Sequence, residues 1–218
     1  MTNSLPASHS QRVAAFLDQV QASHRGRLIF ALDATASRQP TWDASVQLQS
    51  EMFAEAGRIG GLEVQLVYYR GLEECKAGHW TNDTRELANT MSRIVCVSGQ
   101  TQIGRILDHV RKEHARQAVA AVVFIGDMVE EPAHGLYDAA AGCPPLFIFQ
   151  EGPDVLANQV FEEMARLTKG AHLKFTPGSA RELGELLRAV AAFAAGGLTT
   201  LSDLRTDAAV KLLGQMKK

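Results

Sequence analysis

Continuous apolar runs of strand length constrain the fold of this chain more than any other feature. Residues 119–125 and 145–149 are apolar without the alternation of a one-sided strand, a pattern typical of parallel strands buried on both faces. Further strands are expected at 27–32, 62–69 and 172–175, with helical periodicity between them. Alternating strands and helices predict an α/β fold, a three-layer, doubly wound, mostly parallel sheet with helices on both faces.

The helices are expected in the intervals between strands and at both ends of the chain. The sequence before the first expected strand forms a helical extension at 1–25, and one domain follows at 26–195. Gly196 and Gly197 interrupt the helical pattern, so residues 196–218 are a separate tail. The tail is expected to form a helix that packs on the domain or on a partner. A brief edge strand is expected around His79 and Trp80. The expected helical ranges are 11–25, 41–57, 83–95, 102–114, 131–141, 155–169, 179–195 and 207–216.

Composition excludes several classes of function. The 218 residues are 46% hydrophobic and 21% charged with a net charge of −2, which favours neither nucleic acid nor an anionic membrane as a partner. No run reaches the roughly 18 apolar residues of a membrane span. The first ten residues lack the basic and apolar segments of a secretion signal. Three widely spaced cysteines fit reduced thiols, so a cytoplasmic location is expected.

Three oxygen-bearing side chains follow the strand expected at 27–32. Asp33, Thr35 and Ser37 alternate in Asp-Ala-Thr-Ala-Ser, and residues two apart point the same way in extended backbone. One carboxylate and two hydroxyl groups can therefore converge beyond the end of the strand. Such hard oxygen ligands suit Mg2+ or Mn2+ and not zinc.

Two more segments bring oxygen atoms to the same edge of the predicted sheet. Asp127 follows the buried strand at 119–125, and Thr101 stands at the start of the helix expected at 102–114. Parallel strands end, and their following helices begin, on one rim, where open α/β sheets bind ligands. The candidate metal ligands are therefore Asp33, Thr35, Ser37, Thr101 and Asp127.

In this order the five residues resemble the metal-ion-dependent adhesion site of von Willebrand factor A domains. That family has D-x-S-x-S after its first strand, a Thr in a middle loop and an Asp after its fourth strand. Here Thr35 replaces the commoner serine, and Met128 stands where a glycine often follows the aspartate. The resemblance covers roughly residues 26–195. It implies a non-enzymatic, Mg2+-dependent protein-binding module in which an Asp or Glu of the partner completes the coordination of the metal.

Each candidate residue also has a purely local interpretation. Asp33 can form a turn, Thr35, Ser37 and Thr101 can cap helices, and Asp127 can accept bonds from loop amides. Trp42 and Asp43 are expected near the partner-binding rim, although packing explains Trp42 equally well.

Two alternative functions stay open. One is a metal-dependent phosphatase or phosphotransferase with Asp33 as nucleophile. Phosphatases of the haloacid dehalogenase type place a second aspartate as proton donor two residues later, but this chain has Thr35 there. The other alternative is a scaffold of this fold with an unused metal site.

Overall fold

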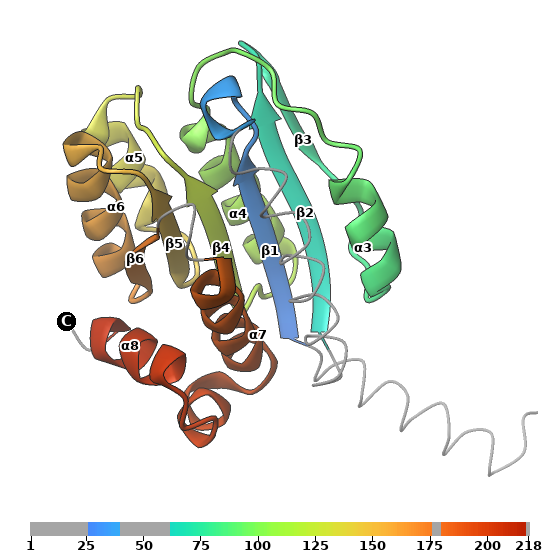
Figure 1. Ribbon diagram of the computed structural model, residues 1–218, viewed down its shortest axis with the longest axis vertical. Helices are drawn as coiled ribbons and strands as arrows, with labels where there is room; N and C mark the ends of the chain where they lie inside the picture. The colour runs from blue at the N-terminus through green and yellow to red at the C-terminus, as the bar shows by residue number, and fades with distance from the viewer. Residues whose placement is uncertain (1–25, 40–61, 176–179, 217–218) are drawn as a thin grey trace, which may run out of the picture.

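The computed structural model describes residues 26–39, 62–175 and 180–216. Within these residues the centre of the fold is a six-stranded sheet in the order β3-β2-β1-β4-β5-β6 (Figure 1). Neighbouring strands are parallel except for the pair β2–β3. The strands are β1 (Gly26–Asp33), β2 (Leu62–Arg70), β3 (Glu74–Ala77), β4 (Ala121–Gly126), β5 (Leu146–Glu151) and β6 (Ala171–Phe175).

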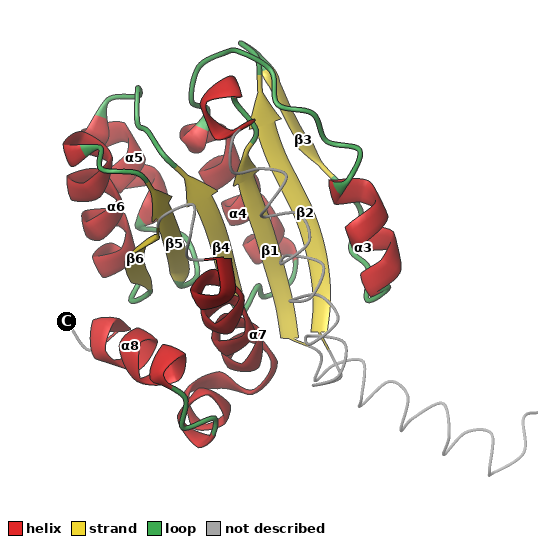
Figure 2. Cartoon of the chain, viewed as in Figure 1, coloured by secondary structure: helices red, strands yellow, loops and turns green. Residues whose placement is uncertain are grey.

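Helices cover both faces of this sheet, which confirms the predicted fold class (Figure 1 and Figure 2). Three helices pack on one face: α4 (Ile103–Arg116), α5 (Ala133–Ala140) and α6 (Val155–Leu167). The other face carries α3 (Thr84–Met91), α7 (Ala180–Asp203) and α8 (Asp207–Met216).

The side chains of β1 show how one strand serves two cores. Leu28, Phe30 and Leu32 belong to the core under α7, whereas Ile29 and Ala31 belong to the core under α4 to α6. This division follows from the alternation of side chains along a strand. Every residue of β4 and β5 is buried, as the uninterrupted apolar runs predicted.

Local capping and backbone geometry set several helix ends. The Asp83 carboxylate accepts bonds from Arg85 and Glu86 N–H groups at the start of α3, and the Asp154 carboxylate accepts from Ala157 N–H at the start of α6. Within α7, Gly197 has φ +72° and ψ −161°, so the helix breaks there as the glycine pair indicated.

Three expected elements differ from the structure, and one is the helix expected at 179–195, because α7 continues to Asp203 beyond the break at Gly197. The edge strand lies at Glu74–Ala77 and not around His79 and Trp80, because β3 forms where the chain turns back directly along β2 in antiparallel register. The helix expected at 83–95 ends at Met91. The residues after it form a loop beside the end of β1, where Val97 N–H donates to Ala34 C=O.

The tail packs on the domain. Helix α8 spans the range predicted for it, and it buries Ala208, Ala209 and Leu212 in the core beside α7. Burial of this apolar stripe explains why the helix is held against the domain. The expected helices at 11–25 and 41–57 lie outside the described residues.

Candidate metal centre at the carboxyl end of the sheet

The order of strands creates a crevice between the ends of β1 and β4. The chain passes from β1 to β2 on one side and later returns to add β4 on the other side of β1. The strands on the two sides of such a switch point send their following loops in opposite directions, which leaves room for a ligand. Leu32 pairs with Ile125 in the β1–β4 register, so Asp33 and Asp127 leave the sheet beside each other.

Asp33 is fully buried at the end of β1. Its Oδ1 accepts a hydrogen bond of 2.8 Å from Thr35 N–H, and its Oδ2 accepts one of 2.8 Å from the Tyr69 hydroxyl. Burial raises the pKa of Asp33 to about 6, and the charge of Asp127 adds to this rise, while the bonds from Thr35 and Tyr69 oppose it. Two neighbouring carboxyl groups therefore share a poorly solvated space.

A buried arginine balances part of this negative charge. Arg38 lies in the short 3-10 helix η1 (Ala36–Arg38) and forms an ion pair with Glu151 at the end of β5. Its guanidinium also lies 5.9 Å from the centre of the Phe175 ring. Burial lowers the pKa of Arg38, and the charges of Asp33 and Asp127 oppose that shift. Arg38 and Glu151 were not among the predicted site residues, because 113 residues separate them in the chain.

The two hydroxyl groups after Asp33 lie side by side. Thr35 Oγ1 and Ser37 Oγ are 3.1 Å apart, with Thr35 buried and Ser37 exposed. Thr35 occupies the capping position of η1, but its side chain makes no capping hydrogen bond. The backbone of the helix therefore does not use this hydroxyl oxygen.

Thr101 is held by two glutamates that the sequence did not single out. Thr101 N–H donates to the Glu130 carboxylate at 2.7 Å, and Glu130 N–H donates to Thr101 Oγ1 at 3.0 Å. Thr101 Oγ1 itself donates to the Glu131 carboxylate, which also accepts from Gly104 N–H in the first turn of α4. Glu131 thus supplies an acceptor for the start of α4, while Gln102 at the capping position makes no side-chain capping bond.

This arrangement leaves Thr101 Oγ1 one unused lone pair. A hydroxyl group has one hydrogen to donate and two lone pairs. The hydrogen goes to Glu131, and the Glu130 N–H takes one lone pair. One lone pair remains for a cation or for water.

Asp127 carries the most unusual atom at this rim. Its side chain is half-buried, and its Oδ1 is buried without a hydrogen-bond partner among the described residues. Most buried polar atoms in proteins have a partner, so this carboxylate oxygen has room for a bond to a cation or to a water molecule. The local interpretation, acceptance from loop amides, does not account for this oxygen.

A cavity of about 210 Å³ opens beside these groups. Thr35, Ser37 and Thr101 line it, whereas Asp33 and Asp127 do not. The structure thus gathers the three hydroxyl residues in one cavity and sets the two aspartates next to each other at the adjoining strand ends. Trp42 and Asp43 lie outside the described residues. The full lining is Thr35, Ala36, Ser37, Ser98, Gly99, Thr101, Met128 and Glu130.

The chemistry of these donors fits a hard divalent cation. Asp33 and Asp127 supply two carboxylates, one with a partnerless oxygen, and the hydroxyl groups supply neutral oxygen atoms. No group of three His, Cys, Asp or Glu residues gathers into a metal-binding cluster in the described parts of the chain. A cation here would therefore depend on the hydroxyl oxygens as well as on the two aspartates.

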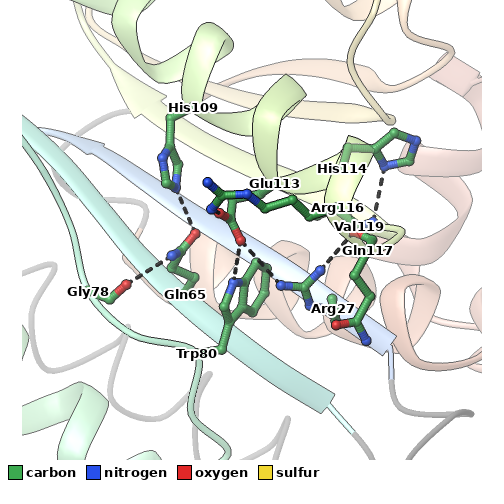
Figure 3. A network of polar contacts seen from close by, with 10 residues as sticks. All are labelled: Arg27, Gln65, Gly78, Trp80, His109, Glu113, His114, Arg116, Gln117 and Val119. Atoms are coloured by element: carbon green, nitrogen blue, oxygen red, sulfur yellow. Dashed lines mark hydrogen bonds and ion pairs between the residues drawn. The ribbon is translucent and has the colours of Figure 1, made fainter.

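A second polar cluster lies at the opposite end of β1 (Figure 3). The Arg27 guanidinium stacks 3.7 Å from the centre of the Trp80 ring and forms an ion pair of 3.4 Å with Glu113. Glu113 also accepts from Trp80 Nε1 at 2.8 Å and from Arg116 at 2.9 Å. The hydrogen bond from Trp80 is the main cause of a lowered pKa of Glu113. This cluster joins β1, the segment after β3 and α4.

None of the helices in the described ranges is both long enough and apolar enough to cross a membrane. Neither a protein-family model nor a curated protein matches the sequence.

Solved structures match this chain in fold. A von Willebrand factor type A protein from Catenulispora acidiphila matches with a TM-score of 0.60 and 16% identity over 79% of this chain and 43% of that one. The VWA domain of SpRpn10 matches with a TM-score of 0.57 and 10% identity over 73% and 95% of the two chains. The pilus adhesin SpaC from Lactobacillus rhamnosus GG matches with a TM-score of 0.61 and 7% identity over 78% and 30%.

This chain therefore spans less than half the length of the Catenulispora protein. At such low identities the likeness concerns the fold and not the activity. Together with the strand order and the helices on both faces, these matches show that the chain has the von Willebrand factor A fold.

Proposed function

We propose that this chain is a non-enzymatic protein-binding module that holds Mg2+ or Mn2+ at the carboxyl rim of its sheet. The observation that carries the proposal is the buried, partnerless Oδ1 of Asp127 beside the fully buried Asp33. Two adjacent carboxylates repel each other, and the buried guanidinium of Arg38, which also pairs with Glu151, offsets only part of this charge. The hydroxyl groups of Thr35, Ser37 and Thr101, all at the neighbouring cavity, would complete the protein's share of the coordination.

The partner is proposed to present a single Asp or Glu carboxylate. Mg2+ prefers six oxygen ligands and retains water where the protein supplies few charged ones. An anionic oxygen of the partner can replace one of these waters at a doubly charged ion with partly neutral ligands. The cation would supply the attraction for the partner's carboxylate, and the side chains of this chain would fix the position of the cation. That SpaC is a pilus adhesin agrees with a binding role for this fold.

The surroundings of Asp33 favour binding over phosphoryl transfer. The side chain two residues after Asp33 is the hydroxyl of Thr35, which pairs with Ser37 and cannot act as the carboxylic acid that a phosphatase of this type uses as proton donor. None of the described residues that line the cavity is a lysine, although a phosphatase needs a cation beside the phosphate. We keep a cytoplasmic location within the proposal, because Cys75, Cys96 and Cys143 form no disulfide.

Titration calorimetry with Mg2+ tests the proposed metal site. The parent protein should bind the ion, Asp33→Ala should abolish binding, and Ser37→Ala should weaken it. Ser37 is exposed, so its substitution leaves the core intact and serves as a check on any folding defect in Asp33→Ala. Added Mg2+ should also raise the melting temperature of the parent, since it binds only the native state. Equal Mg2+ affinity in the parent and both variants would refute the site and leave the scaffold alternative.

Recovery of partners in Mg2+ and in EDTA tests the proposed binding role. A partner recovered only in Mg2+ should lose affinity for Thr101→Ala in surface plasmon resonance, because this change alters the coordination more than the charge of the site. Binding that survives both EDTA and Thr101→Ala would place recognition elsewhere on the domain.

A further inference from the structure

One exposed apolar side chain lines the cavity at the carboxyl rim, and three more lie on the loop that lines this cavity or on the turn that touches the loop. Among the large apolar residues exposed in the described ranges are Leu72 (70% exposed), Val95 (60%), Val97 (43%) and Met128 (44%). Met128 lines the cavity itself. We call these four residues the apolar collar.

Backbone contacts show that the collar is continuous with the cavity. Val97 immediately precedes Ser98 and Gly99, which line the cavity. A Cβ atom on Gly99 would lie 1.9 Å from the carbonyl oxygen of Gly71, so the 95–102 loop and the turn that carries Leu72 touch backbone to backbone.

Two hydrogen bonds fasten this junction. Gln100 N–H donates to Gly71 C=O at 3.2 Å, and Val97 N–H donates to Ala34 C=O at 3.0 Å, directly behind Asp33. Arg70 holds the next part of the loop by a bond of 2.8 Å to Val95 C=O. The collar residues therefore sit on braced backbone beside the predicted metal ligands and not on an isolated loop.

The charges around the cavity restrict what can cover the collar. Glu130 lines the cavity, Glu131 contacts Thr101, and the two aspartates lie next to it. A strongly acidic segment would be repelled by these carboxylates. A segment with one carboxylate and apolar neighbours would meet less repulsion, which the proposed cation would offset, and its apolar side chains would cover surface that is otherwise costly to expose.

We propose that the carboxyl rim docks a partner segment in which a single Asp or Glu is flanked by bulky apolar side chains that cover the collar. This inference rests on the proposed metal-dependent function and specifies the class of segment bound. The carboxylate provides the dependence on the metal. The apolar contacts provide affinity and select among acidic segments, as a water-excluding surround does at protein interfaces.

Phage display of random linear peptides on the immobilised full-length chain tests this inference, with selection in Mg2+ and elution by EDTA. The expected enriched peptides carry one Asp or Glu with Leu, Ile, Phe or Met within two positions. Their synthetic versions should bind the double variant Leu72→Ser, Val97→Ser at least fivefold more weakly in fluorescence polarisation. The matched control is Val210→Ser on α8, since Val210 is 63% exposed and lies outside the collar; it should leave affinity unchanged.

The outcomes separate the two proposals. If EDTA elutes no enriched peptide, the metal-dependent function fails and the docking inference falls with it. If the enriched peptides are acidic but have no apolar preference, or if the double variant binds them normally, the collar is not the docking surface and the metal function stands. Analytical sedimentation of the chain in Mg2+ tests whether a second copy of the chain occupies the collar. If the parent forms a dimer and the double variant does not, a second copy, and not a partner segment, covers the collar.

Discussion

The two ends of β1 carry polar clusters of opposite character. At the amino end, Arg27 meets a carboxylate, an aromatic face and the carbonyl of Gln117, which it contacts at 2.7 Å (Figure 3). At the carboxyl end, Asp33 lies beside a second carboxyl group, and an oxygen of that group has no hydrogen-bond partner among the described residues. The first cluster pairs its carboxylate with two arginines, whereas the second sets two carboxyl groups side by side and balances them only in part, through the buried Arg38.

This difference indicates a division between stability and binding. A buried charge that keeps its partners fixes the packing of the elements that supply them, whereas removal of one partner is strongly destabilising. A buried carboxylate without a partner costs stability in the free protein and is retained where a ligand can satisfy it. We therefore expect substitutions at the amino end to change unfolding and substitutions at the carboxyl end to change Mg2+ affinity.

The largest expected effect on stability is that of Glu113→Ala at the amino end. This change leaves the buried Arg27 guanidinium without its carboxylate and Trp80 Nε1 without its acceptor. Loss of a buried ion-pair partner costs about 3 kcal/mol. Urea denaturation should show this decrease in the free energy of unfolding, and Mg2+ affinity should stay the same.

Glu163→Ala on α6 is the matched control for that experiment. Glu163 pairs with Arg166 at 2.7 Å on a solvated helix surface, where water screens the charges and such pairs contribute little to stability. A similar loss in both variants would mean that the cluster around Glu113 is no more important than a surface pair, and the contrast between the two ends would disappear.

At the carboxyl end, Asp127→Asn should have the reverse profile. The free energy of unfolding should change by less than about 1 kcal/mol, since Asp127 Oδ1 has no hydrogen bond to lose, and the relief of repulsion with Asp33 is offset by the lost attraction to Arg38. Mg2+ affinity should fall at least tenfold, about 1.4 kcal/mol, because the change removes one of the two proposed anionic ligands. Denaturation and calorimetry on one preparation measure both quantities.

Asp138→Asn removes an equivalent charge from the exposed surface of α5 and should change neither quantity. If Asp127→Asn instead destabilises the protein while Mg2+ affinity is retained, Asp127 has a structural role and the carboxyl end resembles the amino end.

The sequence predicted the sheet because its signals are local. Uninterrupted apolar runs marked β4 and β5, and the helix expected at 207–216 matches α8. The five candidate ligands were also chosen from local patterns, at the end of a predicted strand or near the start of a predicted helix, and their role in metal binding stays a prediction. The order of strands was not predicted in detail, because no local pattern says on which side of β1 the strand β4 is added.

What the sequence missed depends on contacts between distant segments. Glu130 and Glu131 act on Thr101 from a loop 29 and 30 residues away, and two consecutive glutamates usually indicate a solvated surface. Trp80 was expected near an edge strand, but it stacks on Arg27. A cation–π contact leaves no pattern in sequence, because neither residue type is unusual at the start of a strand or in a loop.

The smallest effect should come from protonation of His109 in the amino-end cluster. His109 Nε2 lies 2.8 Å from Gln65 Oε1, and Gln65 Nε2 donates to Gly78 C=O at 2.9 Å. The amide oxygen therefore accepts, and His109 Nε2 carries the hydrogen. Burial lowers the pKa of His109, and the neighbouring charges act in both directions, since Glu113 raises it whereas Arg116 and Lys112 lower it.

The sign of the effect follows from linkage. A lowered pKa in the folded state means that the unfolded chain takes up this proton at higher pH, near 6.5. The contribution of neutral His109 to stability is complete above that pH and is lost as the pH falls through the pKa of the folded state. His109→Gln keeps an amide donor for Gln65 but has no titrating group, so the stability of the parent relative to this variant should decrease between pH 7.5 and pH 5. Urea denaturation of both proteins across this pH range measures the difference. If the free energies of unfolding of the two proteins change with pH in the same way, protonation of His109 is not coupled to folding.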